Sequence, residues 1–388
     1  MFVAPGTFDV IFSVYFSISK AKRIVGLLVL LLLLSTSDLL AQAATASQKE
    51  PWSFGVNGYY GALFRYRSGL SALNYTHPFS VELYANRHTI GKRAWERKYR
   101  YPQLGFALSY FNYGVPEELG EAASLTVQLD NALLQTTRGN LRFNLGSGLV
   151  YSTRHYITGV NEQNMAIGSK FCFALIGGFR YEHQLSDKLF LNTHFAFRHF
   201  SNGGLNKPNN GMNFPLVGVG VRYQPKRPTL LPHTDTVVTA LNKRIHLNLK
   251  LAMGRREVLY EDVKTTVHSI SLYASKRLSQ TNSLLLGADA FHDVALSKEY
   301  LNALLPWPEQ EPDPRMLGIT LGHELHFDRT SFLFQFGRYI YQPTGLFPGA
   351  YQRYNLKHLV TKNVSAGVAL VAHTKRAYVI EWGLGLHL

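Results

Sequence analysis

The chain has 388 residues, of which 46% are hydrophobic and 13% aromatic, whereas only 17% are charged. This composition is too apolar for a disordered protein, and its richness in Phe, Tyr and Gly favours strands over helices. The formal net charge is +15. Such a charge indicates nucleic acid as the partner of a soluble protein, but anionic surfaces such as phosphorylated lipid headgroups as the partner of an exported one.

The N-terminal residues 1–43 have the pattern of a secretory signal peptide. Three basic residues within 20–23 precede an unbroken apolar run at 24–34, and a small-x-small exit follows at 41–43. A membrane anchor helix is the alternative, but it needs about 20 apolar residues, more than this run contains. We therefore expect an exported mature chain at 44–388 whose partner is not nucleic acid.

Beyond the signal peptide, alternation of apolar and polar residues recurs from Trp52 to the C-terminus, whereas helical periodicity is almost absent. We find about 16 candidate strands, many of them longer than the 5–6 residues usual in soluble proteins, and about 9–11 residues cross a bilayer obliquely. Residues 377–388 carry apolar side chains on one face and small or polar ones on the other, as in a closing barrel strand. The sequence therefore predicts an all-β protein, a transmembrane antiparallel outer-membrane β-barrel.

The connections between these strands alternate between tight turns and long loops, which is typical of outer-membrane barrels. Two connections, Arg87–Pro102 and Pro225–Lys243, are long on the rim that otherwise carries the tight turns. The second is a candidate boundary between two halves, 52–224 and 244–388. We expect a single barrel of about 16 strands, within a range of about 12–16, with two halves of about eight strands as the alternative.

One segment, 198–213, carries residues typical of a catalytic site where it joins two predicted strands. Alternation places His199 and Ser201 on the more apolar, lipid-facing side of the first strand, and Asn213 on the same side of the next. Same-face neighbours in a strand lie about 6.5–7 Å apart, which leaning side chains can bridge. A serine hydroxyl needs an imidazole to take its proton, and the imidazole needs a third group to hold its tautomer. The three residues therefore predict a hydrolytic site on the outside of the barrel.

The same loop contains a His-x-Ser-Asn run and then a Pro-Asn-x-Gly run, made up of His199, Ser201, Asn202, Pro208, Asn209 and Gly211. This pattern resembles the signature of the outer-membrane lipid A 3-O-deacylases, the acyloxyacyl-hydrolase-like barrel family. The resemblance covers roughly residues 52–223 and leaves 244–388 outside it. It implies that Ser201 is the nucleophile, that His199 is the base and that Asn202 contributes to the oxyanion hole.

Donors close to the serine are expected to stabilise the oxyanion that forms during ester hydrolysis. Backbone and side-chain groups of Asn202, Gly203 and Gly204 are the candidates. Asn209 and Gly211 are expected to shape the loop. None of these roles requires a metal ion or an organic cofactor.

The third member of the catalytic group departs from the family pattern. The orienting Glu of the family corresponds to Asn213 here, and no Asp or Glu occurs within 189–233 to replace it. An Asn oxygen can accept the imidazole N–H, but it cannot stabilise the imidazolium with a full charge. Lower activity or an inactive site is therefore the alternative to a working hydrolase.

The expected function is removal of an ester-linked acyl chain from lipid A of lipopolysaccharide in the outer membrane of a Gram-negative bacterium. A non-catalytic barrel, serving as a pore or a structural protein, is the alternative, and a soluble exported sandwich is a third. Two other features have competing interpretations. The basic run 92–100 either binds lipid phosphates or is a solvated connection, and His292-Asp293 is interpreted as a solvated pair at a strand end.

Overall fold

The computed structural model describes residues 49–64, 70, 73, 76–231, 244–258, 261–303, 312–374 and 376–388. The predicted signal peptide lies outside the described residues. The described part of the chain contains sixteen strands, β1 to β16, and the helices α2 (Ala94–Lys98) and α3 (Val294–Ala303). Within this part, no helix is both long enough and apolar enough to cross a membrane.

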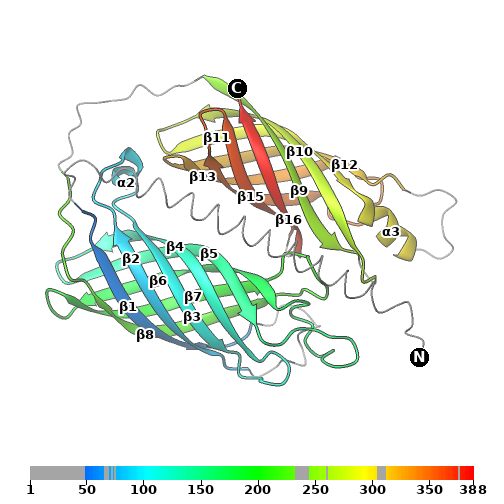
Figure 1. Cartoon of the computed structure of the whole chain (residues 1–388). Coiled ribbons are helices and arrows are strands. Elements are labelled where there is room, and N and C mark those ends of the chain that lie inside the picture. The colour runs from blue at the N-terminus through cyan, green and yellow to red at the C-terminus, as the bar shows by residue number, and fades with distance from the viewer. Residues whose placement is uncertain are drawn as a thin grey trace, which may run out of the picture. The chain divides into compact units, whose positions relative to one another are not determined.

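The first eight strands form a closed antiparallel barrel (Figure 1). Each strand pairs with the next, and β8 pairs back to β1, so that Val56 lies opposite Val221. The strands are β1 (Trp52–Gly61), β2 (Phe79–His88), β3 (Gln103–Asn112), β4 (Glu121–Gln135), β5 (Gly139–Ser152), β6 (Phe171–Gln184), β7 (Leu189–Ser201) and β8 (Met212–Tyr223).

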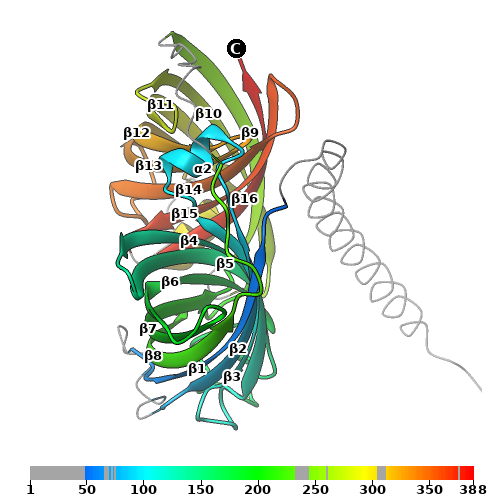
Figure 2. The same ribbon diagram turned by 90° about the vertical axis from the view of Figure 1, so that its left-hand side faces the viewer.

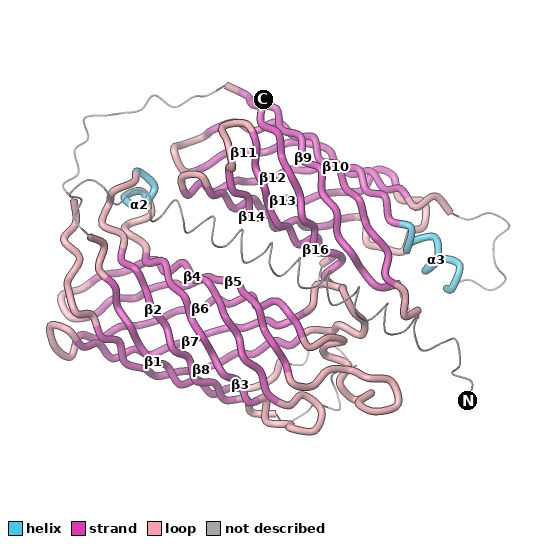
Figure 3. Tube along the Cα trace, viewed as in Figure 1, coloured by secondary structure: helices cyan, strands magenta, loops and turns pink. Residues whose placement is uncertain are grey.

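The other eight strands form a second closed antiparallel barrel (Figure 3). Its closing pair is β16 with β9, in which Leu384 lies opposite Leu251. The strands are β9 (Ile245–Glu257), β10 (Lys264–Arg277), β11 (Asn282–Asp293), β12 (Arg315–Phe327), β13 (Thr330–Tyr341), β14 (Ala350–Leu359), β15 (Val364–His373) and β16 (Arg376–His387).

The predicted fold class and number of strands are confirmed, and the strands close as two barrels instead of one. The reason is the pairing at the boundary: β8 is bonded to β1 and β9 to β16, so the two sheets share no ladder. Figure 2 shows both sheets curving round into closed walls. Closure of each sheet on itself leaves neither with an unpaired edge strand.

Along most of each strand, side chains alternate between the two faces of the wall. In β7, for example, Phe195 and Phe197 are exposed on the outside, while Ala196 and Arg198 are buried inside. The exposed row is apolar because this face meets lipid. The connections β1–β2, β3–β4, β5–β6 and β7–β8 lie on one rim, which we call the long-loop rim, and the tight turn between β6 and β7 lies on the opposite, short-turn rim.

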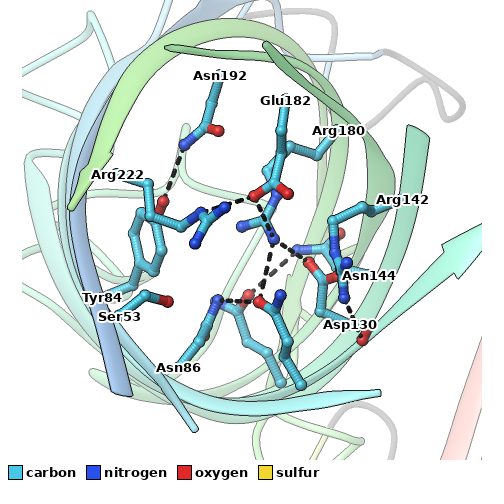
Figure 4. A network of polar contacts seen from close by, with 12 residues as sticks. Ser53, Tyr84, Asn86, Asp130, Arg142, Asn144, Arg180, Glu182, Asn192 and Arg222 are labelled. Atoms are coloured by element: carbon cyan, nitrogen blue, oxygen red, sulfur yellow. Dashed lines mark hydrogen bonds and ion pairs between the residues drawn. The ribbon is translucent and has the colours of Figure 1, made fainter. Parts of the chain in front are cut away.

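The lumen of the first barrel is filled by a network of buried ion pairs (Figure 4). Arg180 lies 2.7 Å from Asp130 and 3.2 Å from Glu182, and Arg222 lies 2.9 Å from Glu182. Arg142 also pairs with Asp130. Each of these side chains is at most 6% exposed. Buried charges are stable only when paired in this way, and the network occupies the space that a water-filled pore would need.

The second barrel has an equivalent filling. Arg353 is fully buried and lies 2.7 Å from Asp289 and 3.4 Å from Glu381, which also accepts a bond from Lys250 at 3.2 Å. The Tyr351 hydroxyl donates to Asp289 at 2.6 Å. Both lumens are therefore packed with side chains around buried ion pairs, and the outer walls are left to interact with lipid.

The basic run 92–100 lies on the short-turn rim of the first barrel, where it contains α2. Tyr99 stacks on Phe327 with ring centroids 4.8 Å apart, and its hydroxyl donates to the Thr281 carbonyl oxygen at 3.3 Å. Trp95 meets the same Phe327 ring edge-on at 5.8 Å. The run is thus a connection whose aromatic residues contact turns of the second barrel.

Candidate active site

His199, Ser201 and Asn213 meet on the outer face of the first barrel, at its long-loop rim. The His199 Nε2 atom lies 3.0 Å from Ser201 Oγ, and His199 Nδ1 lies 2.7 Å from Asn213 Oδ1. The amide oxygen can only accept, so Nδ1 carries the proton and Nε2 is left to accept the serine hydroxyl proton. The three predicted residues therefore form a hydrogen-bonded chain from Ser201 through His199 to Asn213, the arrangement that a serine hydrolase requires of its nucleophile, base and orienting group.

Strand pairing positions these side chains. His199 on β7 lies directly opposite Asn213 on β8, so their side chains leave the wall on the same face at neighbouring positions. Ser201 is two residues beyond His199 on that face, as the alternation predicts. All three are half-buried, and the exposed apolar residues Phe197 and Val217 continue the same face away from the rim. An acyl chain lying against this wall would have its ester close to the serine.

The residues next to the site residues in β7 and β8 point into the lumen, where their packing holds the rim in place. Phe200 and Phe214 are fully buried in the lumen, with ring centroids 5.6 Å apart. Phe111 meets Phe200 at 5.1 Å, and Tyr113 stacks on Phe214 at 5.6 Å. We call these four residues the aromatic cluster. Its packing fixes the ends of β7 and β8 and thereby the geometry of the outward-facing site.

The loop after Ser201 is ordered by Asn202, which is fully buried. Its Nδ2 donates to the Asn206 carbonyl oxygen at 2.8 Å and to Ser169 Oγ at 3.2 Å, and its Oδ1 accepts the Gly204 N–H at 3.0 Å. The Asn202 N–H donates to Asn209 Oδ1 at 3.1 Å. The N–H donors of Asn202 are thus used to hold the loop, and its expected role as an oxyanion donor stays a prediction.

Two other groups suit the oxyanion better. Among the residues that the structure describes, neither the Gly203 N–H nor the Asn209 Nδ2 has a hydrogen-bond acceptor. Gly203 has φ +68°, a conformation that glycine adopts without strain, and this turn sets the direction of its N–H two residues after the serine. An N–H that faces no protein acceptor is free to bind a developing oxyanion.

The loop also rests on a neighbouring loop of its own barrel. The Gly211 N–H donates to the Ala166 carbonyl oxygen at 2.8 Å, and the Asn210 Nδ2 donates to the Met165 carbonyl oxygen at 2.9 Å. Gly211 has φ +74°. The predicted shaping residues Asn209 and Gly211 therefore both lie within the hydrogen-bonded part of the loop.

The second barrel contacts the same loop from its outer wall. The Gly204 carbonyl oxygen accepts the Glu257 N–H at 3.2 Å, and the Glu257 carboxylate accepts the Lys207 N–H at 3.1 Å. The Lys207 ammonium lies 2.9 Å from Glu299 on α3. Ile380 of β16 occupies the space where a side chain on residue 203 would lie. Glu257 belongs to the outward-facing row of β9 but is only 7% exposed, because this loop lies beside it.

None of these second-barrel partners was predicted from the sequence. Glu257, Glu299 and Ile380 lie 50 or more residues along the chain from the loop residues that they contact. The sequences of β9, β16 and α3, which contain these residues, have the same alternation or polar composition as elements that make no such contact. The one signal available was an acidic residue, Glu257, in a lipid-facing row, where an ionised side chain needs a partner.

Two matches to known families cover most of the chain. Residues 79–222 match the family described as lipid A 3-O-deacylase (PagL), and residues 245–388 match the family described as acyloxyacyl hydrolase, C-terminal domain. The second match includes the strands that the sequence resemblance left outside the family. The two segments together contain strands β2 to β16 apart from the last residue of β8.

Similar solved structures were also found. The crystal structure of the outer membrane enzyme PagL is 16% identical, covers 43% of this chain and 97% of that chain, and has a TM-score of 0.33. Neisserial surface protein A is 15% identical, covers 45% of this chain and 96% of that chain, and has a TM-score of 0.31. Likenesses this weak carry no part of the family assignment. Among curated proteins, no sequence matches the chain.

The family matches fall on the barrel that holds the serine site and on the barrel that contacts its loop. The members of the matched family act on lipid A in the outer membrane and hydrolyse an ester. This chain belongs to the lipid A 3-O-deacylase family of outer-membrane β-barrel ester hydrolases.

Proposed function

We propose that the protein removes an ester-linked acyl chain from lipid A in the outer leaflet, with Ser201 as nucleophile, His199 as base and Asn213 as orienting group. The observation that carries this proposal is the pair of contacts at His199, 3.0 Å to Ser201 Oγ and 2.7 Å to Asn213 Oδ1. Such a pair on a lipid-facing wall suits a substrate that never leaves the membrane. The predicted signal peptide at 1–43 supports export of the chain to that membrane.

The reaction proceeds in two halves. Ser201 Oγ attacks the acyl carbonyl carbon while His199 Nε2 takes the hydroxyl proton, and the carbonyl oxygen becomes the oxyanion. The C–O bond to the sugar then breaks, and His199 returns the proton to the departing sugar oxygen. A water molecule, deprotonated by His199, attacks the acyl-serine and releases the fatty acid with regeneration of Ser201.

The oxyanion is held by groups of the loop that follows the serine. The Gly203 N–H and the Asn209 Nδ2 are assigned as its donors, and Asn202 and Gly204 hold the loop in shape. Preorganised donors of this kind typically contribute about 3–4 kcal/mol each to transition-state stabilisation. Asn213 keeps the proton on His199 Nδ1 in both halves of the reaction.

The alternative of a pore or structural barrel receives less support. Arg180 and Arg353, at the centres of the two lumens, are buried and paired with carboxylates. A site of three convergent polar side chains on the lipid-facing wall also has no role in conduction.

The test is mass spectrometry of lipid A from Gram-negative cells that express the wild type, Ser201→Ala or His199→Ala. We expect the wild type to remove the mass of one acyl chain, and both variants to leave lipid A intact. Ser186→Ala, which changes a serine in the tight turn between β6 and β7, is the matched control and should behave as the wild type. Unchanged lipid A with the wild type folded in the outer membrane, and with a lipid A bearing the susceptible ester, would disprove the proposal.

A further inference from the structure

A group of basic side chains lies on the lipid-facing wall of the second barrel at its long-loop rim. Arg255 on β9, Lys264 and His268 on β10, and His292 on β11 all point outward and are exposed. His268 lies directly opposite His292, with ring centroids 6.5 Å apart. Arg255 lies opposite Thr266, midway between the two basic residues of β10. We call these four residues the basic patch.

None of the four side chains of the basic patch forms an ion pair with a described residue, although Lys264 lies opposite Glu257 in the strand pairing and its charge acts on that carboxylate. Among the described residues, the Arg255 side chain has no ion-pair or hydrogen-bond partner. Of the acidic groups nearby, Glu257 faces the loop after Ser201, and Asp313 pairs with Arg315 at 2.8 Å. Glu261, in the loop between β9 and β10, lies 4.0 Å from Lys298.

His292 was interpreted from the sequence as one half of a solvated pair with Asp293, and the structure separates the two residues. The Asp293 side chain is fully buried in the lumen, where it lies 2.6 Å from Arg256 and accepts a hydrogen bond from Tyr378 at 2.7 Å. His292 faces outward. Its imidazole is therefore free to serve the outer surface together with His268.

Cationic side chains on the outer wall of a barrel carry an energetic cost that depends on depth. The cost falls from about 2–4 kcal/mol at the bilayer midplane to nearly zero at the interface. Arg255 is two residues from the end of its strand and His292 one residue from the end of its strand, so both lie in the interfacial zone. The phosphate groups of lipid A lie at this level of the outer leaflet, and their charge is complementary to the patch.

The basic patch borders the proposed active site. Lys264 Nζ donates to Asn206 Oδ1 at 3.2 Å, within the loop that follows Ser201. On the neighbouring strand, Glu257 binds the same loop two residues from Arg255 and on the same face. A glycolipid with its ester at Ser201 would therefore have its headgroup beside these side chains.

We propose that the basic patch binds a phosphate group of the lipid A molecule whose ester is presented to Ser201. This inference rests on the proposed function and gives the second barrel a role in substrate recognition. Arg255 supplies a fork of N–H donors that suits phosphate oxygens, and the imidazoles of His268 and His292 add further donors. Because the contact is made equally in the ground and transition states, its loss raises KM and leaves kcat unchanged.

The test compares two substrates with the full-length protein in mixed detergent micelles. One is bis-phosphorylated lipid A, and the other is the same lipid A with its phosphates removed. For Arg255→Glu we expect kcat/KM on the phosphorylated substrate to fall about tenfold or more, and kcat/KM on the other substrate to stay within about twofold of the wild type. Arg255→Lys keeps the charge and should retain most of the wild-type value.

Arg338→Glu is the matched control, because Arg338 is also an exposed arginine on the outer wall but lies on β13, opposite Ile319 and away from the patch. It should leave both substrates unaffected. Equal losses on both substrates for Arg255→Glu, or no loss on either, would overturn the proposal.

A binding measurement separates this proposal from the proposed function. Native mass spectrometry of the Ser201→Ala protein records how much phosphorylated and dephosphorylated lipid A stays bound. We expect the phosphorylated lipid to be retained in preference, and Arg255→Glu in the Ser201→Ala background to abolish that preference. If the wild type hydrolyses nothing but the preference depends on Arg255, the deacylase proposal fails and the basic patch stands. If the wild type hydrolyses lipid A but no preference exists, the basic patch fails alone.

Discussion

Asn213 stands where the resemblance to the deacylase family implies a Glu. Its Oδ1 accepts a hydrogen bond from the His199 imidazole at 2.7 Å, as the proposed orienting role requires. The electrostatic role of a Glu at this position is not filled, because a neutral amide cannot offset the positive charge that develops on the imidazole. The described residues of the loop between β7 and β8 contribute no carboxylate of their own to take over that role.

Asn213→Asp is therefore expected to raise activity. The new carboxylate can accept the same N–H and stabilise the imidazolium, so we expect kcat for acyl release to increase about 10- to 100-fold. Steady-state kinetics with lipid A in mixed micelles measures this change. Asn213→Leu, which removes the acceptor, should lower kcat, and a kcat for Asn213→Asp at or below the wild-type value would refute the orienting role.

Asn202 illustrates how one residue type can serve two purposes. Family resemblance implied an oxyanion donor, whereas its side chain bonds to Ser169, Asn206 and Gly204. Both roles require an amide directly after the serine, so sequence cannot distinguish them. In the structure the Asn202 side chain is buried and its hydrogen bonds to these three residues hold the loop, whereas the oxyanion role implied by the resemblance stays a prediction.

At the scale of elements, the site lies at the ends of two neighbouring strands, β7 and β8. Their outward-facing side chains form the site, and their inward-facing side chains pack in the lumen. His199 and Ser201 face lipid, and Phe200 between them is fully buried in the aromatic cluster. Alternation thus couples the geometry of the site to the packing behind it. Loss of a ring from the cluster should loosen the rim as well as lower stability.

Phe200→Ala should lower the free energy of unfolding by about 3–5 kcal/mol, because it leaves a cavity among three other rings. It should also reduce kcat, since the ends of β7 and β8 would no longer be fixed. Phe195→Ala, on the same strand but 59% exposed on the outer wall, should cost much less. Urea unfolding in phospholipid vesicles, followed by tryptophan fluorescence, compares the two. Equal losses would contradict the anchoring role of the cluster.

At the scale of the whole molecule, the second barrel is joined to the catalytic loop by polar and apolar contacts. Lys207 reaches Glu299, whose carboxylate also binds Arg256 at 2.7 Å. Burial alone would raise the pKa of Glu299, but the hydrogen bonds from Arg256 and the charges around it hold this pKa below its usual value. The carboxylate therefore stays ionised and keeps its hold on the loop at neutral pH.

Ile380→Ala tests whether the second barrel positions the loop. Ile380 packs against Gly203, whose N–H is assigned to the oxyanion, so a smaller side chain should free the loop and lower kcat several-fold with little change in KM. Leu384→Ala is the control, because Leu384 lies on the same face of β16 but is 64% exposed to lipid. Kinetics on lipid A micelles distinguishes them, and equal kcat values for both variants would show that the loop needs no support from β16.

Much of this molecule was determined by the sequence alone. Period-two alternation, strand length and alternating connections predicted sixteen transmembrane strands, because each depends only on neighbouring residues and bilayer thickness. The meeting of His199, Ser201 and Asn213 followed from the same alternation on two adjacent strands.

The tertiary structure alone decided the rest. Closure into two barrels depends on whether β8 bonds to β1 or to β9, and both choices satisfy the same local pattern. The contacts of Glu257 and Ile380 with the catalytic loop join residues far apart in the chain, and no periodicity encodes them. Alternation and strand length depend on residues that are close in the sequence, so the sequence alone shows them. Which strand or loop an edge contacts depends on how the entire chain packs, so only the tertiary structure shows it.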